Sequence, residues 1–248
     1  MKETVIVAGI GPGSYSQMTQ EVIHALSDCE CIVGYPLYLD LLRPHFPEKE
    51  YVGTPMRQEE ARCRLALSLA ASGKKVVFVC SGDAGVYGLA GLLFELAEEY
   101  AVHVRVLPGV TAALGGAALL GAPLIHDFAV VSLSDALTPW THIERRLRCA
   151  AAGDFCIVLY NPVSRRRKDY LQKACEILLE ILPEGRPCGY ARQIGREGEY
   201  AYLCTLSELR VQELDMFSTV FIGNSCTRIR GGHLVTPRGY ACEREQDE

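Results

Sequence analysis

The order of apolar and polar residues along the chain predicts strands that alternate with helices. Eight runs of mainly apolar residues have the length of strands, and several are apolar throughout, which is typical of strands covered on both faces. These runs lie at residues 4–9, 31–34, 75–80, 103–107, 128–133, 155–160, 187–191 and 219–223. The clearest helix is expected over residues 170–182, where one face carries Leu171, Ala174, Cys175, Leu178 and Leu182. This alternation favours an α/β fold with a largely parallel sheet.

A linker is expected near residue 121. Residues 112–121 are mostly small, and Ala122 and Pro123 follow them. We therefore predict two α/β lobes over residues 1–121 and 122–240, with a glycine-rich loop in the first lobe. Residues 241–248 are polar and acidic, and we expect them to form a tail without fixed structure. Ligands in such folds bind at the carboxyl ends of strands or between domains.

Composition narrows the class of protein. The chain has 248 residues, 49% of them hydrophobic, which suffices for one large core or two small ones. A net charge of -5 does not favour bulk binding to nucleic acid or to an anionic membrane. No run approaches the roughly 20 apolar residues of a membrane helix, and we expect no signal peptide and a cytoplasmic protein. The 11 cysteines include no C-x-x-C pair, which favours buried, reduced thiols and no metal site.

The first candidate ligand loop is the GIGPG segment at residues 9–13, directly after the first strand. A dinucleotide-binding loop would need its third glycine three residues after the second, and an acidic residue at the end of the second strand. Here Ser14 holds the glycine position, Pro12 lies within the loop, and the second strand ends in Gly34 and Tyr35. On this segment alone, a tight turn without a ligand is as good an interpretation as a ligand site.

The second candidate loop is SGDAGVYG at residues 81–88. Its backbone amides could bind a carboxylate, and Asp83 could bind an ammonium group or hydroxyls. Alternatively, Asp83 is a helix cap in a glycine-rich turn. The two interpretations are equal on this segment alone.

Three further strand ends carry polar residues. Thr111 follows the fourth strand and could also serve only for packing, Tyr160 and Asn161 end another strand, and Arg192 follows Ala191 at a third. After Asn161 comes a basic run over residues 165–168. Such a run is usually a solvated helix start, but four cations there oppose the helix dipole, which favours an anionic partner.

Together these segments resemble one family. GIGPG, SGDAGVYG, PGVTA, YNP and ARQIGREGE occur here in the order and spacing of the tetrapyrrole methyltransferases, and the resemblance spans roughly residues 3–230. Residues 134–140, 160–162 and 189–192 are most similar to members that methylate carbon 17 of a cobalamin precursor. Both the metal-free precursor and its cobalt analogue stay open as substrates.

The resemblance implies two α/β lobes, a homodimer, a tetrapyrrole substrate, and S-adenosylmethionine as cofactor, with S-adenosylhomocysteine as product. It places the cofactor between the lobes, against Pro12, Ser81, Gly82, Asp83, Val86, Thr111, Ala112, Tyr160, Asn161 and Ala191. Gly11 and Gly13 would border the macrocycle. Relatives that methylate uroporphyrinogen have an aspartate after the first loop, proposed as a base. This chain has Ser14 there, so that role is not carried over.

The expected chemistry asks little covalent work of the protein. A ring carbon of the electron-rich macrocycle attacks the sulfonium methyl group, and in-line positioning can supply roughly 7–11 kcal/mol. The ring contraction that the resemblance also implies requires an acid or base, for which Ser14, His126 and Asp135 are candidates. His126 has a structural role in the linker as its alternative. Candidates for pairing the substrate carboxylates are Arg57, Arg165, Arg166, Arg167 and Arg192, each with a surface role as alternative.

Three other functions are compatible with parts of the pattern. A sibling methyltransferase would act on another carbon. A nicotinamide-dependent oxidoreductase would use the first glycine loop, whose spacing opposes it. A tetrapyrrole carrier without activity would leave the loops at residues 81–88 and 108–112 unexplained.

Overall fold

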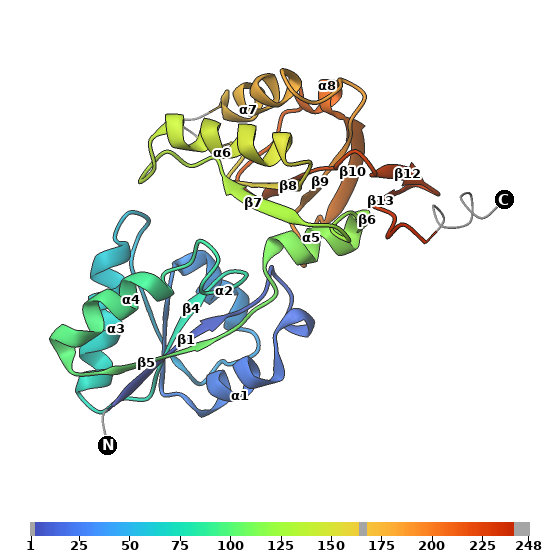
Figure 1. The fold of residues 1–248 in the computed structure, drawn as a ribbon. Helices are drawn as coiled ribbons and strands as arrows, with labels where there is room; N and C mark the ends of the chain where they lie inside the picture. The colour runs from blue at the N-terminus through green and yellow to red at the C-terminus, as the bar shows by residue number, and fades with distance from the viewer. Residues whose placement is uncertain (1–2, 164–167, 241–248) are drawn as a thin grey trace. The chain divides into compact units, whose positions relative to one another are not determined.

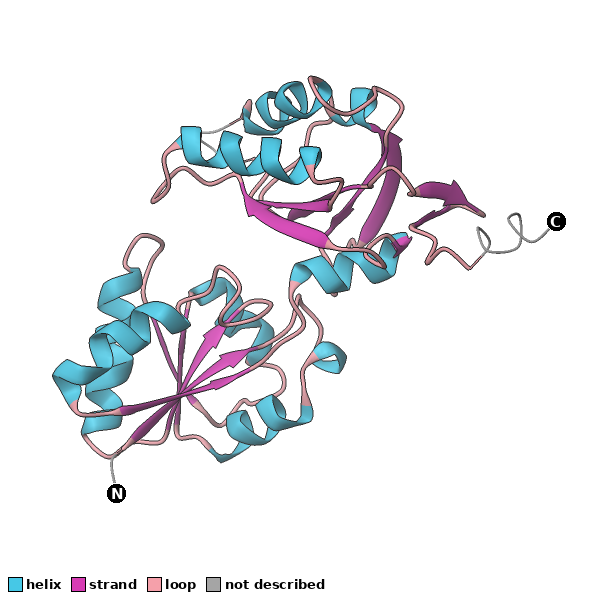
Figure 2. Ribbon diagram, in the orientation of Figure 1, coloured by secondary structure: helices cyan, strands magenta, loops and turns pink. Residues whose placement is uncertain are grey.

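The computed structural model describes residues 3–163 and 168–240. It divides the chain into two compact units, Met1–Ala112 and Ala113–Glu248. The first unit contains a sheet with helices on both of its faces (Figures 1 and 2). The boundary was expected at residue 121, but the helix that precedes this position packs within the second unit. The predicted tail at 241–248 lies outside the described residues.

The sheet of the first unit is entirely parallel, in the order β3-β2-β4-β1-β5. Its strands are β1 (Thr4–Gly9), β2 (Cys31–Gly34), β3 (Glu50–Gly53), β4 (Val76–Cys80) and β5 (His103–Leu107). The connecting helices are α1 (Gln20–Asp28), α2 (Pro36–Leu42), α3 (Glu59–Ala71) and α4 (Ala90–Ala97), with short 3-10 turns at Tyr15–Gln17 and Glu98–Tyr100.

Each face of this sheet has its own apolar core. Phe78 and Val7 point towards α3 and α4, where they pack against Leu67 and Leu93. On the other face, the core includes Ala8, Ile10, Ile32, Val77 and Val79, with Val22 and Leu26 of α1 and Leu39 and Leu42 of α2. The strands are therefore continuously apolar because both of their faces are covered.

The second unit has a mixed sheet in the order β10-β9-β11-β8-β7. Its strands are β7 (Phe128–Ser132), β8 (Cys156–Tyr160), β9 (Pro187–Arg192), β10 (Tyr200–Thr205) and β11 (Ser218–Ile222). We expected a largely parallel sheet, but in this sheet only β7 and β8 pair in parallel. The strands β10 and β11 run antiparallel to their neighbours. No helix separates β9 from β10, and a short connection of this kind produces antiparallel pairing.

Helices cover the second sheet as well. The helices α6 (Trp140–Ala152), α7 (Tyr170–Leu179) and α8 (Leu206–Leu209) share one apolar core with it. The helix α5 (Ala112–Leu120) packs so closely that a Cβ atom on Gly116 would lie 2.8 Å from the Phe221 ring. This packing explains why α5 belongs to the second unit. A small sheet joins β6 (Gly121–Ala122), β12 (Arg228–Arg230) and β13 (His233–Val235) in the order β12-β13-β6.

All eight predicted strands are present, with ends that differ by at most one residue. The strands β3, β6, β10, β12 and β13 were not predicted. The predicted helix over residues 170–182 ends at Leu179. Leu182 still packs in the core, held by a bond from its N–H to the Leu178 carbonyl (2.8 Å).

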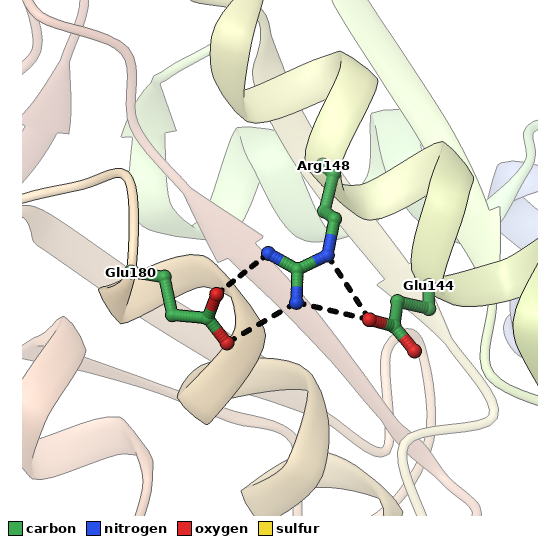
Figure 3. A network of polar contacts seen from close by, with 3 residues as sticks. All are labelled: Glu144, Arg148 and Glu180. Carbon is green, nitrogen blue, oxygen red and sulfur yellow. Dashed lines mark hydrogen bonds and ion pairs between the residues drawn. The ribbon is translucent and has the colours of Figure 1, made fainter.

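An ion-pair network lies on the outer surface of the second unit (Figure 3). Arg148 of α6 donates two hydrogen bonds to Glu144, one turn earlier, and two more to Glu180, which follows α7. The bonds from Arg148 lower the pKa of Glu180. Since all three side chains are more than one third exposed, water and salt screen the network.

Ten of the 11 cysteines lie in the described part of the chain, and all ten are free thiols. Eight are buried as expected, while Cys149 and Cys226 are exposed. Burial raises the pKa of Cys63, Cys175 and Cys204 to about 12, so these thiols stay protonated at neutral pH. None of the described helices is long and apolar enough to span a membrane.

Candidate functional site

Three loops of the first unit meet where β1, β4 and β5 end. The N–H of Gly11 donates to the Gly82 carbonyl (3.0 Å), and the N–H of Gly82 donates back to the Gly11 carbonyl (2.7 Å). A Cβ atom on Gly9 would lie 2.6 Å from the Gly82 oxygen, and one on Gly109 would lie 2.2 Å from it. Glycine is required at both positions because backbone atoms, which cannot move aside, fill the space.

Asp83 holds this crossing together. Its Oδ1 accepts hydrogen bonds from the N–H groups of Gly85 (2.8 Å) and Val86 (3.1 Å), and its Oδ2 accepts one from the N–H of Gly109 (3.0 Å). A carboxylate with three such bonds fixes the loop after β4 and joins it to the loop after β5. The helix-cap interpretation is wrong, because α4 begins only at Ala90. Asp83 instead positions the backbone around it.

The loop after β4 exposes its tip and buries its base. Val86 is 36% exposed and Tyr87 is 55% exposed. Gly82 is buried, and a Cβ atom there would lie 3.5 Å from Thr111 Cα and 3.7 Å from the Ala112 nitrogen. The structure thus brings together six of the seven cofactor residues predicted for the first unit, which are Ser81, Gly82, Asp83, Val86, Thr111 and Ala112. The seventh, Pro12, follows Gly11, which exchanges hydrogen bonds with Gly82.

The first glycine loop lies beside this crossing. Gly11 has a φ of +74° and is buried together with Pro12, while Gly13 and Ser14 are half-buried. The Oγ atoms of Ser14 and Ser16 lie 3.0 Å apart. This contact orients the Ser14 hydroxyl but supplies no charge to activate it, so the role of Ser14 as an acid or base stays a prediction.

In the second unit, β7, β8 and β9 run in one direction, so their carboxyl ends share an edge. The hydroxyl of Tyr160 accepts a hydrogen bond from the N–H of Ala113 (2.6 Å). Asn161 follows with a φ of +54°, and its Nδ2 donates to Ser132 Oγ (2.9 Å). Both predicted cofactor residues at this edge are therefore fixed in orientation by neighbours.

Two of the predicted acid–base residues lie at opposite ends of β7. Asp135 follows the strand, and its Oδ2 accepts a hydrogen bond from the Tyr170 hydroxyl (2.5 Å), whose ring packs 4.6 Å from Trp140. His126 precedes the strand, with its Nδ1 3.0 Å from Asn224 Nδ2. A strand of five residues is roughly 17 Å long, so the two are not brought together. Asp135 lies at the same edge as Asn161, and His126 does not.

The end of β9 carries Ala191 and Arg192. Ala191 is fully buried and pairs with both β10 and β11. The Nε and Nη2 atoms of Arg192 contact Asp215 Oδ2, at 2.9 and 2.6 Å. A substrate carboxylate would have to share this guanidinium with Asp215. The predicted substrate residues Arg165, Arg166 and Arg167 lie outside the described residues.

Unfavourable backbone conformations gather at the carboxyl ends of the strands. Among the described residues, six that are not glycine have a positive φ. Four of them follow strands at these edges, namely Arg57 after β3, Tyr87 after β4, Asn161 after β8 and Gln193 after β9. Such conformations are unfavourable for residues with a Cβ atom and accumulate at functional sites. The two edges are therefore independently marked as candidate sites.

Comparison with known proteins decides the family. The model for tetrapyrrole (corrin/porphyrin) methylases matches residues 4–210. The chain belongs to this family. The match begins at β1 and extends past α8, so it includes all the strand ends described above.

Two relatives and one solved structure are similar to this tetrapyrrole methylase over nearly all of its length. A probable cobalt-factor III C(17)-methyltransferase of Salmonella typhimurium is 44% identical, over 94% of this chain and 98% of the relative. A precorrin-3B C(17)-methyltransferase of Sinorhizobium sp. is 42% identical, over 97% of this chain and 98% of the relative. The crystal structure of the methyltransferase CobJ has a TM-score of 0.90 and 40% identity, covering 95% of this chain and 100% of that chain.

Sequence reasoning missed one charged residue near the first edge of this methylase. Arg62 of α3 is only 4% exposed, and its Nη1 donates to the carbonyl (3.0 Å) and the hydroxyl (2.9 Å) of Thr54. It thereby fixes the start of the loop after β3, in which Arg57 is exposed. The sequence pattern could have revealed this burial. Arg62 precedes the buried Ala66 by four residues, so both lie on the same face of the helix.

A cavity of about 620 Å³ lies elsewhere in the first unit. It is lined by residues of α1, by the starts of β1 and β4, and by Arg105 and Leu107 of β5. None of the predicted site residues in the described part of the chain lines it. The candidate site of the first unit is therefore the glycine crossing at the opposite ends of β1 and β4.

Proposed function

We propose that the chain is an S-adenosylmethionine-dependent methyltransferase that methylates carbon 17 of precorrin-3B or of its cobalt analogue, with contraction of the macrocycle. The observation that carries this proposal is the sequence identity of 42–44% to two proteins named for that methylation. The matches extend over nearly the full length of this chain and of each relative. One is named for the cobalt-containing substrate and the other for precorrin-3B, so the proposal includes both.

The first-unit loops fit an adenosyl cofactor. When bound, S-adenosylmethionine supplies the electrophilic methyl group. Gly82 is buried against Thr111, while Val86 of the same loop is an exposed apolar side chain, which suits a ligand with a flat apolar part. Asp83 contributes by holding Gly85 and Val86 in place, since its oxygens accept bonds from their N–H groups. Tyr160, Asn161 and Ala191 remain proposed contacts of the second unit.

Binding the macrocycle requires cations, because its side chains are carboxylates. Arg57 is exposed at the first edge, and Arg192 is 41% exposed at the second although paired with Asp215. We assign both to substrate binding, together with Arg165, Arg166 and Arg167 on the strength of the sequence alone. Gly11 and Gly13 would border the macrocycle through their backbone.

The proton transfers of ring contraction need a residue that holds a proton at a defined atom. Asp135 is the best placed of the three candidates, because its carboxylate is oriented by the Tyr170 hydroxyl at the edge that also carries Asn161. A phenol that donates to a carboxylate fixes the direction of the carboxylate, as an acid or base that exchanges a proton with the substrate requires. Ser14 stays a second candidate, and His126 is better explained as part of the structure around Asn224.

The proposal is tested by anaerobic incubation of the purified chain with S-adenosylmethionine and either metal-free precorrin-3B or cobalt-loaded substrate. We expect one new methyl group at carbon 17, identified by NMR of the product, and formation of S-adenosylhomocysteine. A methyl group on another carbon would assign the chain to a sibling reaction. Binding of NAD in preference to S-adenosylhomocysteine, measured by calorimetry, would overturn the methyltransferase proposal. The homodimer and the cytoplasmic location stay predictions, and the first is checked by light scattering.

A further inference from the structure

Tyr87 combines an unfavourable backbone conformation with a high exposure to solvent. Its φ is +54°, a conformation that is unfavourable for a bulky side chain and that glycine adopts freely. The residue is also exposed, with 55% of its surface accessible to solvent. Burial of the ring therefore does not offset the unfavourable backbone conformation.

The loop on both sides of Tyr87 is held rigidly. On one side, Asp83 accepts the N–H groups of Gly85 and Val86. On the other, Gly88 packs on Ala84 so closely that a Cβ atom would lie 2.3 Å from the Ala84 oxygen. The fold thus presents the tyrosine outwards in one backbone conformation and does not let it relax.

The position of Tyr87 indicates the kind of ligand. It lies after β4, at the carboxyl edge of a fully parallel sheet, where ligands bind in folds of this class. Val86 beside it is apolar and exposed as well. A fixed, exposed aromatic ring next to an apolar side chain is suited to a flat conjugated ring, through stacking and burial of apolar surface.

We propose that Tyr87 is a substrate-positioning residue, whose ring stacks on the conjugated macrocycle of the tetrapyrrole. This inference rests on the proposed function, since it takes a tetrapyrrole as the substrate. The adenine ring of the cofactor has the same chemistry, so the experiment must separate the two.

The test uses two substitutions and a matched control. Tyr87→Gly removes the ring and suits the positive φ, whereas Tyr87→Phe keeps the ring. Ala101→Gly is the control, because Ala101 has the same φ of +54° but lies in the turn before β5, away from the carboxyl edge. Steady-state kinetics with each substrate varied separately, absorbance titration with the tetrapyrrole, and calorimetry with S-adenosylhomocysteine provide the readouts.

We expect Tyr87→Gly to raise the KM and the Kd for the tetrapyrrole roughly two- to tenfold, the range of aromatic stacking. Ala101→Gly should match the wild type in both, and Tyr87→Phe, which keeps the ring, should lie closer to the wild type than Tyr87→Gly does. The melting temperature of Tyr87→Gly should stay within about 2 °C of the wild type or rise, because strain is relieved while the unfolded chain gains freedom. Affinity for S-adenosylhomocysteine should not change.

Two results would overturn the inference. One is unchanged tetrapyrrole binding in Tyr87→Gly, and the other is weaker S-adenosylhomocysteine binding, which would give the ring to the cofactor. If Tyr87→Gly does not fold, Tyr87→Asn replaces it, since asparagine tolerates this conformation. A wild-type chain that binds but does not methylate the tetrapyrrole would refute the proposed function, while the binding titrations would still decide the role of Tyr87.

Discussion

The carboxyl edges of the two sheets are built from different parts of the chain. At the first edge, backbone groups meet each other, since Gly11 and Gly82 exchange hydrogen bonds and Asp83 binds only N–H groups in its described contacts. At the second edge, side chains meet side chains, as in the pairs Asn161–Ser132, Tyr170–Asp135 and Arg192–Asp215.

This difference separates two tasks. A backbone crossing without space for a Cβ atom has one geometry and suits a site whose ligand is always the same. Polar side-chain pairs can be exchanged without moving the backbone, and they carry the groups that take up protons or bind anions. We therefore expect substitutions within the backbone crossing of the first edge, such as those at Gly109 and Asp83, to act on folding and cofactor affinity together. Substitutions in the Tyr170–Asp135 and Arg192–Asp215 pairs of the second edge should act on proton transfer and substrate binding.

The largest effect is expected from Gly109→Ala. The new Cβ atom would lie 2.2 Å from the Gly82 oxygen and 2.4 Å from the Gly9 oxygen, so backbone would have to move. We expect the free energy of unfolding to fall by roughly 4 kcal/mol or more, measured by urea denaturation. Gly91→Ala is the matched control, because nothing lies within 4 Å of its Cβ position. The control should stabilise α4 by roughly 0.5–1 kcal/mol. If the two variants were equally stable, the backbone crossing would not be packed closely enough to exclude a Cβ atom at Gly109.

Asp83→Ala should rank second. It leaves three backbone N–H groups without their acceptor, and we expect a loss of roughly 2–3 kcal/mol in the free energy of unfolding. Calorimetry should show weaker binding of S-adenosylhomocysteine in the same variant, because the loop is no longer held. Asp83→Asn keeps one acceptor oxygen and should lie between Asp83→Ala and the wild type. Weaker cofactor binding at wild-type stability would instead mean that Asp83 acts as a direct ligand.

Tyr170→Phe tests the second edge. It removes the hydrogen bond to Asp135 and keeps the ring that packs on Trp140. We expect the free energy of unfolding to fall by about 1.5 kcal/mol, with the KM for S-adenosylmethionine unchanged and the pH dependence of kcat altered. Tyr51→Phe, which loses a neutral bond to the Phe46 carbonyl, is the control and should leave the pH profile alone. A wild-type pH profile in Tyr170→Phe would remove Asp135 and Tyr170 from the chemistry.

The smallest effect is expected at the surface network around Arg148. Because Arg148 lowers the pKa of Glu180, its contribution is present above the ordinary carboxyl pKa of 4.5 and is lost as the pH falls through the lowered value. Both side chains are exposed, so Arg148→Ala should change the melting temperature only slightly at pH 7, and less still at acidic pH as Glu180 becomes protonated. A large loss at pH 7 would show that this exposed side-chain network, and not only the edges, governs stability.

The strands of the two sheets were predictable to different degrees. Buried strands such as β4 and β8 were predicted to within one residue, because a continuous apolar run is the direct consequence of burial on both faces. The strand β3 was missed because it is an edge strand of four residues whose ends, Glu50 and Gly53, are exposed. The strand β10 was missed because its first three residues are exposed. Parallel and antiparallel pairing in the second sheet depends on connections that an apolar pattern does not encode.

By itself, the sequence determined the α/β class, the glycine-rich strand ends and the resemblance to the family, because these depend on local composition and on the order of short segments. Only the tertiary structure decided what Asp83 does. Its third hydrogen bond, to Gly109, joins residues that are 26 positions apart and meet because β4 and β5 both flank β1. The same holds for Tyr170 and Asp135, and for α5, whose place was decided by the packing of Gly116 on Phe221. Local pattern fixes which face of an element is apolar, but the partner of a polar group depends on which elements the chain brings together.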